Sequence, residues 1–162
     1  MYAHPGKKLN FMGNEIGQLR EWDEKREQDW FILKYPNHDA FHHFMKDLNN
    51  LYLTHSALSS EDYIQHGFQW LDCHQEARCI YAFERKDSKE RIAAVFNFSD
   101  KVQKDFKLTV PGGKELHVLL DSNRDIYGGT KQYPEKGTVL KLKKECISLD
   151  LEPYSAVYYL VK

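Results

Sequence analysis

The sequence is poor in cysteine, has no long apolar run and carries almost no net charge, and each shortage excludes a class of protein. Its three cysteines are an odd number without the spacing of a zinc site, so we expect reduced thiols and a cytoplasmic protein. No apolar run approaches the roughly 20 residues of a membrane span, and the first eight residues lack the apolar stretch of a signal peptide. Lys and Arg number 23 against 24 Asp and Glu, a formal net charge of -1, which argues against nucleic-acid and membrane-surface partners.

The sequence does contain enough apolar material for a folded core. Its 162 residues are 41% hydrophobic and 14% aromatic, which suits one domain of ordinary size or one domain plus a fragment of another. The two parts of the chain differ in pattern. Residues 1-58 hold one short apolar run, a charged loop and a helical pattern, whereas residues 59-162 are dominated by short β-rich runs.

A helix is predicted over residues 39-54. Apolar side chains recur there every three or four positions, which places them on one face. Asn37 or Asp39 is expected to cap its start, because a short oxygen-bearing side chain can accept hydrogen bonds from free backbone N–H groups. We expect the helix to dock on the second part of the chain through Phe41, Phe44 and Leu48. The full apolar set is Phe41, Phe44, Met45, Leu48, Leu51 and Tyr52.

Eight short β-rich runs, separated by Gly, Pro and charged residues, fill the second part of the chain. Alternation of apolar and polar residues in Phe106–Val110 and Val139–Lys143 indicates strands with one buried and one wet face. Such short strands predict a mainly β fold, an antiparallel β-sandwich, rather than a parallel βαβ sheet. The predicted strands are Phe68–Leu71, Cys79–Arg85, Ile92–Phe98, Phe106–Val110, Leu116–Asp121, Thr138–Leu142, Ile147–Leu149 and Ala156–Val161.

The apolar segment Leu9–Met12 has the length of a strand and stops at Gly13, yet nothing else in the chain can serve as its parallel partner. A lone parallel strand is not a stable unit. We therefore expect the chain to be part of a longer protein, in which Met1 is an internal residue. An exposed apolar edge at this segment would favour self-association as a consequence of truncation.

The stretch His4–Gln18, followed by Arg20-Glu21-Trp22, resembles the last barrel strand and loop of bacterial 1,4-α-glucan (glycogen) branching enzymes, members of the α-amylase superfamily. Ile16 and Asp23 depart mildly from the family pattern, where Phe and Asn are usual. The resemblance implies that residues 1-58 end a (β/α)8 barrel, with its last strand, loop and helix 39-54, and that residues 59-162 form a C-terminal β-sandwich. Further motifs match in order: Asp29-Trp30, Leu48-Asn49, Leu51-Tyr52, Ala57-Leu58, Gly67-Phe68 with Trp70, Asn97-Phe98 and Tyr127-Gly128-Gly129.

Branching enzymes cut an α-1,4-glucan bond and transfer the freed segment to a 6-hydroxyl, so the resemblance implies a role in glycogen synthesis. Retaining chemistry of this kind needs two carboxyl groups about 5–5.5 Å apart. By the resemblance, the catalytic Asp, Glu and third Asp of the family lie upstream of Met1. The chain alone is therefore expected to be structural and inactive, with α-glucan as substrate of the full-length enzyme and no metal or other cofactor.

The loop after Gly13 holds the candidate substrate contacts. By the resemblance it follows the last barrel strand and faces the mouth of the active site. Glu15 would then position a sugar or a catalytic group, with Gln18 beside it, and Trp22 would stack on a sugar ring. The alternative is an exposed charged loop without a role in binding, because most charged side chains are simply exposed.

Two further patterns favour structural roles. His38 and His42 are four residues apart, and His43 follows, so two imidazoles could meet on one helix face. A zinc site needs a further ligand that the sequence does not indicate, so we expect surface histidines. The aromatic residues alternate along the predicted strands, which favours core packing over a glucan-binding face. These aromatic residues are Phe68, Trp70, Tyr81, Phe83, Phe96, Phe98, Tyr154, Tyr158 and Tyr159.

Two alternative functions stay open. One is an autonomous glucan-binding β-sandwich, which would hold sugar on an exposed aromatic residue such as Trp70. The other is the C-terminal part of a different α-amylase-superfamily enzyme, such as a debranching or trehalose-forming enzyme. The run from Phe11 to Gln18 resembles branching enzymes more than these.

Overall fold

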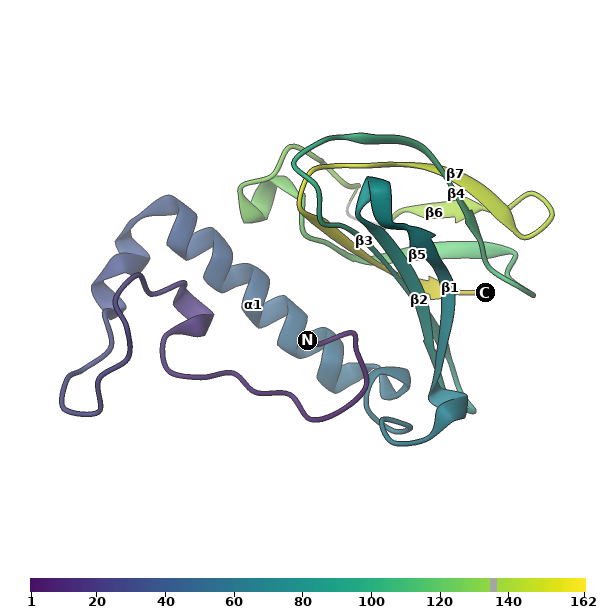
Figure 1. Ribbon diagram of the computed structural model, residues 1–162. Coiled ribbons are helices and arrows are strands. Elements are labelled where there is room, and N and C mark those ends of the chain that lie inside the picture. The colour runs from purple at the N-terminus through teal and green to yellow at the C-terminus, as the bar shows by residue number, and fades with distance from the viewer. Residues whose placement is uncertain (135–136) are drawn as a thin grey trace.

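The computed structural model describes residues 1–134 and 137–162, which form one long α-helix and eight β-strands. The helix α1 (Pro36–Thr54) follows a stretch of loops and short 3₁₀ turns (Figure 1). All eight predicted strands are confirmed, with small shifts of their ends. The strands are β1 (Phe68–Gln75), β2 (Ile80–Lys86), β3 (Arg91–Asn97), β4 (Gln103–Thr109), β5 (Glu115–Asp121), β6 (Val139–Lys141), β7 (Cys146–Leu151) and β8 (Ser155–Val161).

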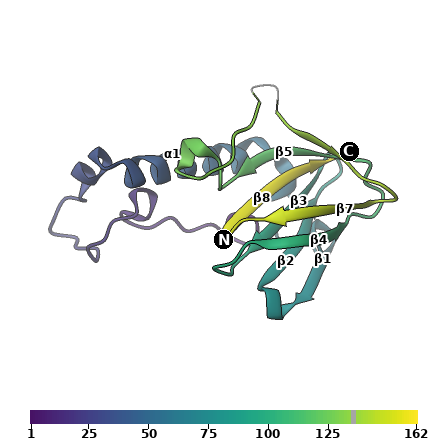
Figure 2. The ribbon, with the colours of Figure 1, turned by 90° about the horizontal axis from the view of Figure 1, so that it is seen from above.

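The strands form two antiparallel sheets. The larger sheet has six strands in the order β1-β2-β3-β8-β5-β6, and the smaller sheet pairs β4 with β7. At the centre of the larger sheet β3 pairs with β8, so that Ile92 lies opposite Leu160 and Asn97 opposite Ser155. Figure 2 shows the smaller sheet lying over the larger one. The predicted antiparallel sandwich is therefore confirmed.

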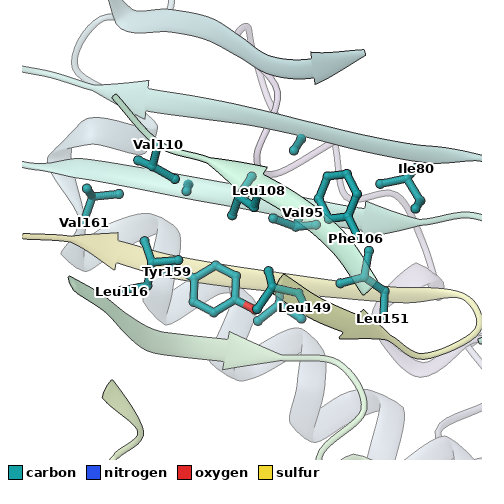
Figure 3. Packing of buried hydrophobic residues seen from close by; sticks show 13 residues of the cluster. Ile80, Val95, Phe106, Leu108, Val110, Leu116, Leu149, Leu151, Tyr159 and Val161 are labelled. Atoms are coloured by element: carbon teal, nitrogen blue, oxygen red, sulfur yellow. The ribbon is translucent and has the colours of Figure 1, made fainter. Parts of the chain in front are cut away.

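The core of the sandwich lies between these two sheets and is built by alternation along each strand. Phe106 and Leu108 of β4 point inward and are each 1% exposed, whereas Lys107 between them faces solvent. They meet Val95 of β3 from the larger sheet (Figure 3). The buried members of this core are Ile80, Ala82, Ala93, Val95, Phe106, Leu108, Val110, Leu116, Leu149, Leu151, Val157, Tyr159 and Val161.

The helix α1 covers the other face of the larger sheet, which makes the molecule three layers deep (Figure 1). Met45, Leu48 and Leu51 are buried on its inner face. They join a second core with Leu120 of β5 and Tyr158 of β8. Among the described residues, no helix combines the length and the apolar character needed to cross a membrane.

The helix begins at Pro36, three residues before the predicted start at residue 39. The expected capping by Asn37 or Asp39 is wrong, because Tyr35 occupies the cap position and contributes no side-chain hydrogen bond. Proline suits the first helical position, since its fixed φ matches the helix and the N–H it lacks would be unpaired there.

Of the three predicted docking residues, Leu48 is buried in this second core and Phe44 packs against it. Phe44 is half-buried and packs edge-on against Tyr127, with ring centroids 5.3 Å apart. Phe41 is 38% exposed, and its ring lies against Gly17 of the preceding loop rather than against the sheet. The prediction that Phe41 docks on the sheet is therefore wrong.

Leu9–Met12, predicted as the last barrel strand of a longer protein, form no strand in this chain. Leu9 is 68% exposed and Phe11 is 43% exposed. A strand is held by hydrogen bonds to a neighbour, and the described residues supply no neighbour here. The assignment of residues 1-58 to the end of a barrel stays a prediction.

A buried ion pair ties the first residues of the chain to the sheet. The guanidinium of Arg85, on β2, is fully buried and donates to Ala3 O at 3.1 Å, Gly67 O at 3.0 Å and Asp62 Oδ1 at 2.6 Å. Lys8 approaches the other oxygen of Asp62 at 3.6 Å. Burial lowers the pKa of Lys8, while Asp62 opposes that shift and Arg85 adds to it. The N-terminal segment is thus anchored by charge as well as by apolar contact.

A second polar joint connects the end of α1 to the turn between β2 and β3. The carboxylate of Asp87 accepts hydrogen bonds from the hydroxyls of Ser56 at 2.5 Å and Ser60 at 3.0 Å. Backbone N–H groups of Lys89 and Glu90 also donate to it. Burial works against the charged form, but these four donors hold the pKa of Asp87 well below its usual range.

Candidate functional site

The predicted substrate loop is a short, tightly bonded turn. Asn14–Ile16 form one 3₁₀ turn between Gly13 and Gly17, whose φ angles of 86° and 62° lie in the left-handed region. A Cβ at Gly13 would lie only 2.7 Å from Gln18 Cβ, so both space and backbone conformation require glycine there. Ile16 is fully buried and anchors the turn.

Glu15 lies half-buried at the centre of this turn with its carboxylate lightly engaged. Its Oε2 accepts a long hydrogen bond of 3.5 Å from Asn10 Nδ2. Its backbone carbonyl lies 3.1 Å from Nδ1 of His42 on α1. The main chain of Glu15 is thus held by the helix, while its carboxylate stays available to a ligand.

Gln18 is engaged at both ends of its amide. Its Oε1 accepts a hydrogen bond of 2.9 Å from the backbone N–H of Asp29, and its Nε2 donates to Arg20 O at 3.1 Å. Arg20 in turn pairs with Asp29 through Nε at 3.3 Å and Nη2 at 3.1 Å. These contacts tie the two ends of the charged loop together, so in this structure Gln18 serves the loop rather than offering an open amide.

Trp22 is 49% exposed and packs edge-on against Phe11, with ring centroids 5.5 Å apart. One part of the indole is therefore open to solvent. Of the other acidic residues, Glu21 and Glu24 are exposed, whereas Asp23 is half-buried and its carboxylate accepts the backbone N–H of Lys25 at 2.9 Å. The expectation of an exposed charged loop therefore describes Glu21 and Glu24 but not the turn that carries Glu15.

The histidines near the start of α1 contact backbone carbonyls. His38 Nδ1 lies 2.8 Å from Ile16 O, and His42 Nδ1 lies 3.1 Å from Glu15 O. Within the described residues, no group of three or more His, Cys, Asp or Glu side chains is placed to hold a metal ion. The expectation of plain surface histidines holds for His43, which bonds only within its own helix. The four-residue spacing of the other two was the signal for a shared face.

A second candidate site is an aromatic groove on the larger sheet, beside the first residues of the chain. This cavity of about 320 Å³ is lined by Trp70, Tyr81, Phe83, Phe96 and Phe98, together with Met1, Ala3 and His4. The Phe96 and Phe98 rings are stacked with centroids 5.6 Å apart. Trp70 is 45% exposed and Phe98 is 61% exposed. The predicted core packing is therefore correct for Phe83, which is 5% exposed, and wrong for Trp70 and Phe98 at the rim of the groove.

The remaining aromatic residues divide in the same way. Tyr158 and Tyr159 are each 4% exposed, and burial raises the pKa of both hydroxyls. Tyr154 is 72% exposed in the turn before β8. The aromatic set thus mixes core residues with a solvent-facing cluster on one edge of the sheet.

Comparison with known proteins identifies the β-rich part of the chain. The family described as "Alpha amylase, C-terminal all-beta domain" matches residues 70–162. The chain belongs to this family.

Relatives of this alpha-amylase C-terminal domain extend the match toward residue 1. The chain is 36% identical to the 1,4-alpha-glucan branching enzyme GlgB of Aquifex aeolicus, over 98% of this chain and 26% of that protein. It is 40% identical to GlgB 1 of Clostridium perfringens, over 90% of this chain and 22% of that protein. The predicted resemblance to branching enzymes is confirmed, and the chain spans about a quarter of the length of these relatives.

Solved structures support the fold of the domain. Trehalulose synthase MutB from Pseudomonas mesoacidophila superimposes with a TM-score of 0.51 and 22% identity, over 75% of this chain and 18% of that chain. A similarity at this identity concerns the fold alone. The alpha-amylase C-terminal domain therefore supplies the sandwich, while the predicted loop residues lie outside the matched range.

Proposed function

We propose that the chain forms the C-terminal part of a 1,4-α-glucan branching enzyme. Such an enzyme cuts an α-1,4-glucan bond and transfers the freed segment to a 6-hydroxyl, which creates the branches of glycogen. The observation that carries the proposal is the 35–40% identity to branching enzymes over 80–98% of the chain. That similarity extends to residues 1–69, which precede the alpha-amylase C-terminal domain.

In this proposal the catalytic carboxylates belong to the rest of the enzyme, and the chain supplies support. The sandwich carries α1 on its outer face, and α1 carries the turn with Glu15 through His38 and His42. Glu15 and Trp22 would contact the glucan, and Gln18 would keep their loop in shape. The isolated chain is therefore expected to have no branching activity.

Two expectations about the surroundings of the chain belong to the same proposal. A cytoplasmic location is in keeping with three cysteines that stand as free thiols. Self-association of the isolated chain would use the exposed apolar side chains of Leu9 and Phe11. Size-exclusion chromatography of the wild type beside a Leu9→Ser and Phe11→Ser double variant tests the second expectation, because only the wild type should elute as a dimer.

A chimera tests the main proposal. The chain replaces the matched part of the Aquifex aeolicus enzyme, and branching of amylose is compared among the chimera, the truncated relative and the chain alone. We expect activity in the chimera and none in the other two. A folded chimera without activity, or activity in the isolated chain, would refute the proposal.

A second candidate function is glucan holding by the aromatic groove, favoured by the exposure of Trp70 and Phe98 in a lining that is mostly aromatic. Flat aromatic rings offer an apolar surface to the C–H face of a sugar ring. The test is a titration of the chain with maltoheptaose and glycogen. Trp70→Ala should abolish any saturable binding, whereas Trp30→Ala, an equally exposed tryptophan outside the groove, should leave binding unchanged.

A further inference from the structure

Two imidazoles on one face of α1 hold the turn that carries Glu15. His38 Nδ1 lies 2.8 Å from Ile16 O, and His42 Nδ1 lies 3.1 Å from Glu15 O. A carbonyl oxygen can only accept a hydrogen bond, so each Nδ1 carries the proton. In the neutral ring this fixes the tautomer in which Nε2 is unprotonated. The two rings therefore donate hydrogen bonds to two consecutive carbonyls of one turn, an arrangement called here the histidine clamp.

The hydrogen bonds within the turn leave two of its carbonyls available to the histidines. Its own hydrogen bonds, from Gln18 N to Gly13 O at 3.0 Å and from Gly17 N to Asn14 O at 3.3 Å, leave the Glu15 and Ile16 carbonyls free to accept from the helix. A Cβ at Gly17 would lie 3.6 Å from His38 Nδ1, so the turn packs closely on that ring. Figure 1 shows the turn lying beside the N-terminal half of α1.

We propose that His38 and His42 are positioning residues, which set the direction of the Glu15 carboxylate through the backbone of its turn. The identity of the ligand, an α-glucan, rests on the proposed function; the clamp itself rests on the two hydrogen bonds. His43 provides a matched control, because it is the next residue along the helix and its Nδ1 contacts Asp39 of the same helix, at 3.0 Å from Asp39 O and 3.6 Å from Asp39 Oδ2. Its loss leaves the turn untouched.

The first experiment measures the clamp in the 162-residue chain itself, without any activity. Nitrogen NMR of the imidazoles should report the Nδ1–H tautomer for His38 and His42. Amide hydrogen exchange of Gly17 and Gln18 should become roughly two- to tenfold faster in His38→Ala and in His42→Ala, the effect of one lost hydrogen bond. His43→Ala should leave that exchange at the wild-type rate.

Rescue distinguishes a positioning hydrogen bond from general packing. Asparagine places an amide N–H close to the position of Nδ1, whereas glutamine places it where Nε2 would lie. His38→Asn and His42→Asn should therefore restore slow exchange, and the corresponding Gln variants should not. Wild-type exchange rates in the Ala variants, or the Nε2–H tautomer at both positions, would overturn the clamp.

The second experiment measures KM and kcat for amylose in the chimera described above, with and without the histidine variants. Because the turn contacts substrate before and during reaction, its displacement should raise KM for amylose several-fold with a smaller change in kcat, and the Asn variants should reverse this. Faster exchange with an unchanged KM would overturn the positioning role while leaving the proposed function intact. A wild-type chimera without branching activity would refute the proposed function, and the exchange rates would still decide the clamp.

Discussion

Replacing Arg85 by Met is expected to destabilise the chain more than loss of any surface charge. The guanidinium is fully buried, and its removal leaves the carbonyls of Ala3 and Gly67 without their donor. It also leaves Asp62, whose side chain is 8% exposed, with only Lys8 at 3.6 Å. Removing one partner of a buried ion pair costs about 3–5 kcal/mol, because the other charge stays buried and uncompensated.

That cost translates into a measurable shift in melting temperature. For a domain of this size each kcal/mol lowers Tm by about 2–4 °C, so Arg85→Met should melt roughly 6–20 °C below the wild type. Thermal unfolding followed by circular dichroism gives this shift. A second change, Asp62→Leu in the Arg85→Met background, should recover part of the loss because it removes the orphaned charge.

The matched control is the ion pair of Lys104 with Asp150, which are 2.8 Å apart with side chains 67% and 50% exposed. Lys104→Met should leave Tm unchanged, since solvent screens that pair. If Arg85→Met melts within about 2 °C of the wild type, the buried pair does not anchor the N-terminal segment. The same conclusion would follow if Asp62→Leu lowered Tm further in the Arg85→Met background.

Three further predictions concern the other joints of the fold. Leu48→Ala should cost about 2–5 kcal/mol of unfolding free energy in urea, and half-buried Phe44→Ala should cost less; equal stability of Leu48→Ala and wild type would refute docking of α1 through this face. Asn97→Ala should lower the unfolding free energy by about 1–3 kcal/mol, because its buried amide donates to three backbone carbonyls, and wild-type stability in the same titration would contradict that role. For Asp87, whose pKa is lower in the folded than in the unfolded chain, the stabilisation is present above about pH 5 and is lost as pH falls toward the folded value. Asp87→Asn should therefore lower Tm at pH 7, and its difference from the wild type should shrink at pH 3; a constant difference would show that charge is not the cause.

The strands could be predicted from sequence because their signals are local. Alternation and turn residues mark each strand without reference to its neighbours, and all eight were located. The order of the strands could not be predicted, since β3 pairs with β8 and β5 pairs with β8 across long stretches of chain. Strand β1 extends to Gln75, beyond its apolar run, because backbone pairing with β2 continues through two irregularities of register.

The residues of the candidate site stay a prediction, and the contacts that hold them could not be predicted from sequence. Glu15 and Trp22 were proposed by resemblance. The spacing of His38 and His42 indicated a shared helix face, but their partners are backbone carbonyls, which no sequence pattern identifies. The anchoring of Ala3 by Arg85 was missed for the same reason. Strand β2 ends in the charged run Glu84-Arg85-Lys86, and nothing in that run marks Glu84 and Arg85 as the buried members.

The position of the Glu15 turn relative to the sandwich depends on α1, because this helix carries two different faces. Leu48 and its apolar neighbours dock it on the larger sheet, while His38 and His42 hold the turn. Between the anchored Ala3 and the turn, Leu9 and Phe11 are exposed and belong to neither core of the sandwich. A change that loosens α1 on the sheet should therefore displace the turn, even though it touches no residue of the loop. Leu48→Ala should accordingly speed amide exchange at Gly17, whereas an equal loss of stability placed in the sandwich core, by Leu108→Ala, should affect Gly17 far less.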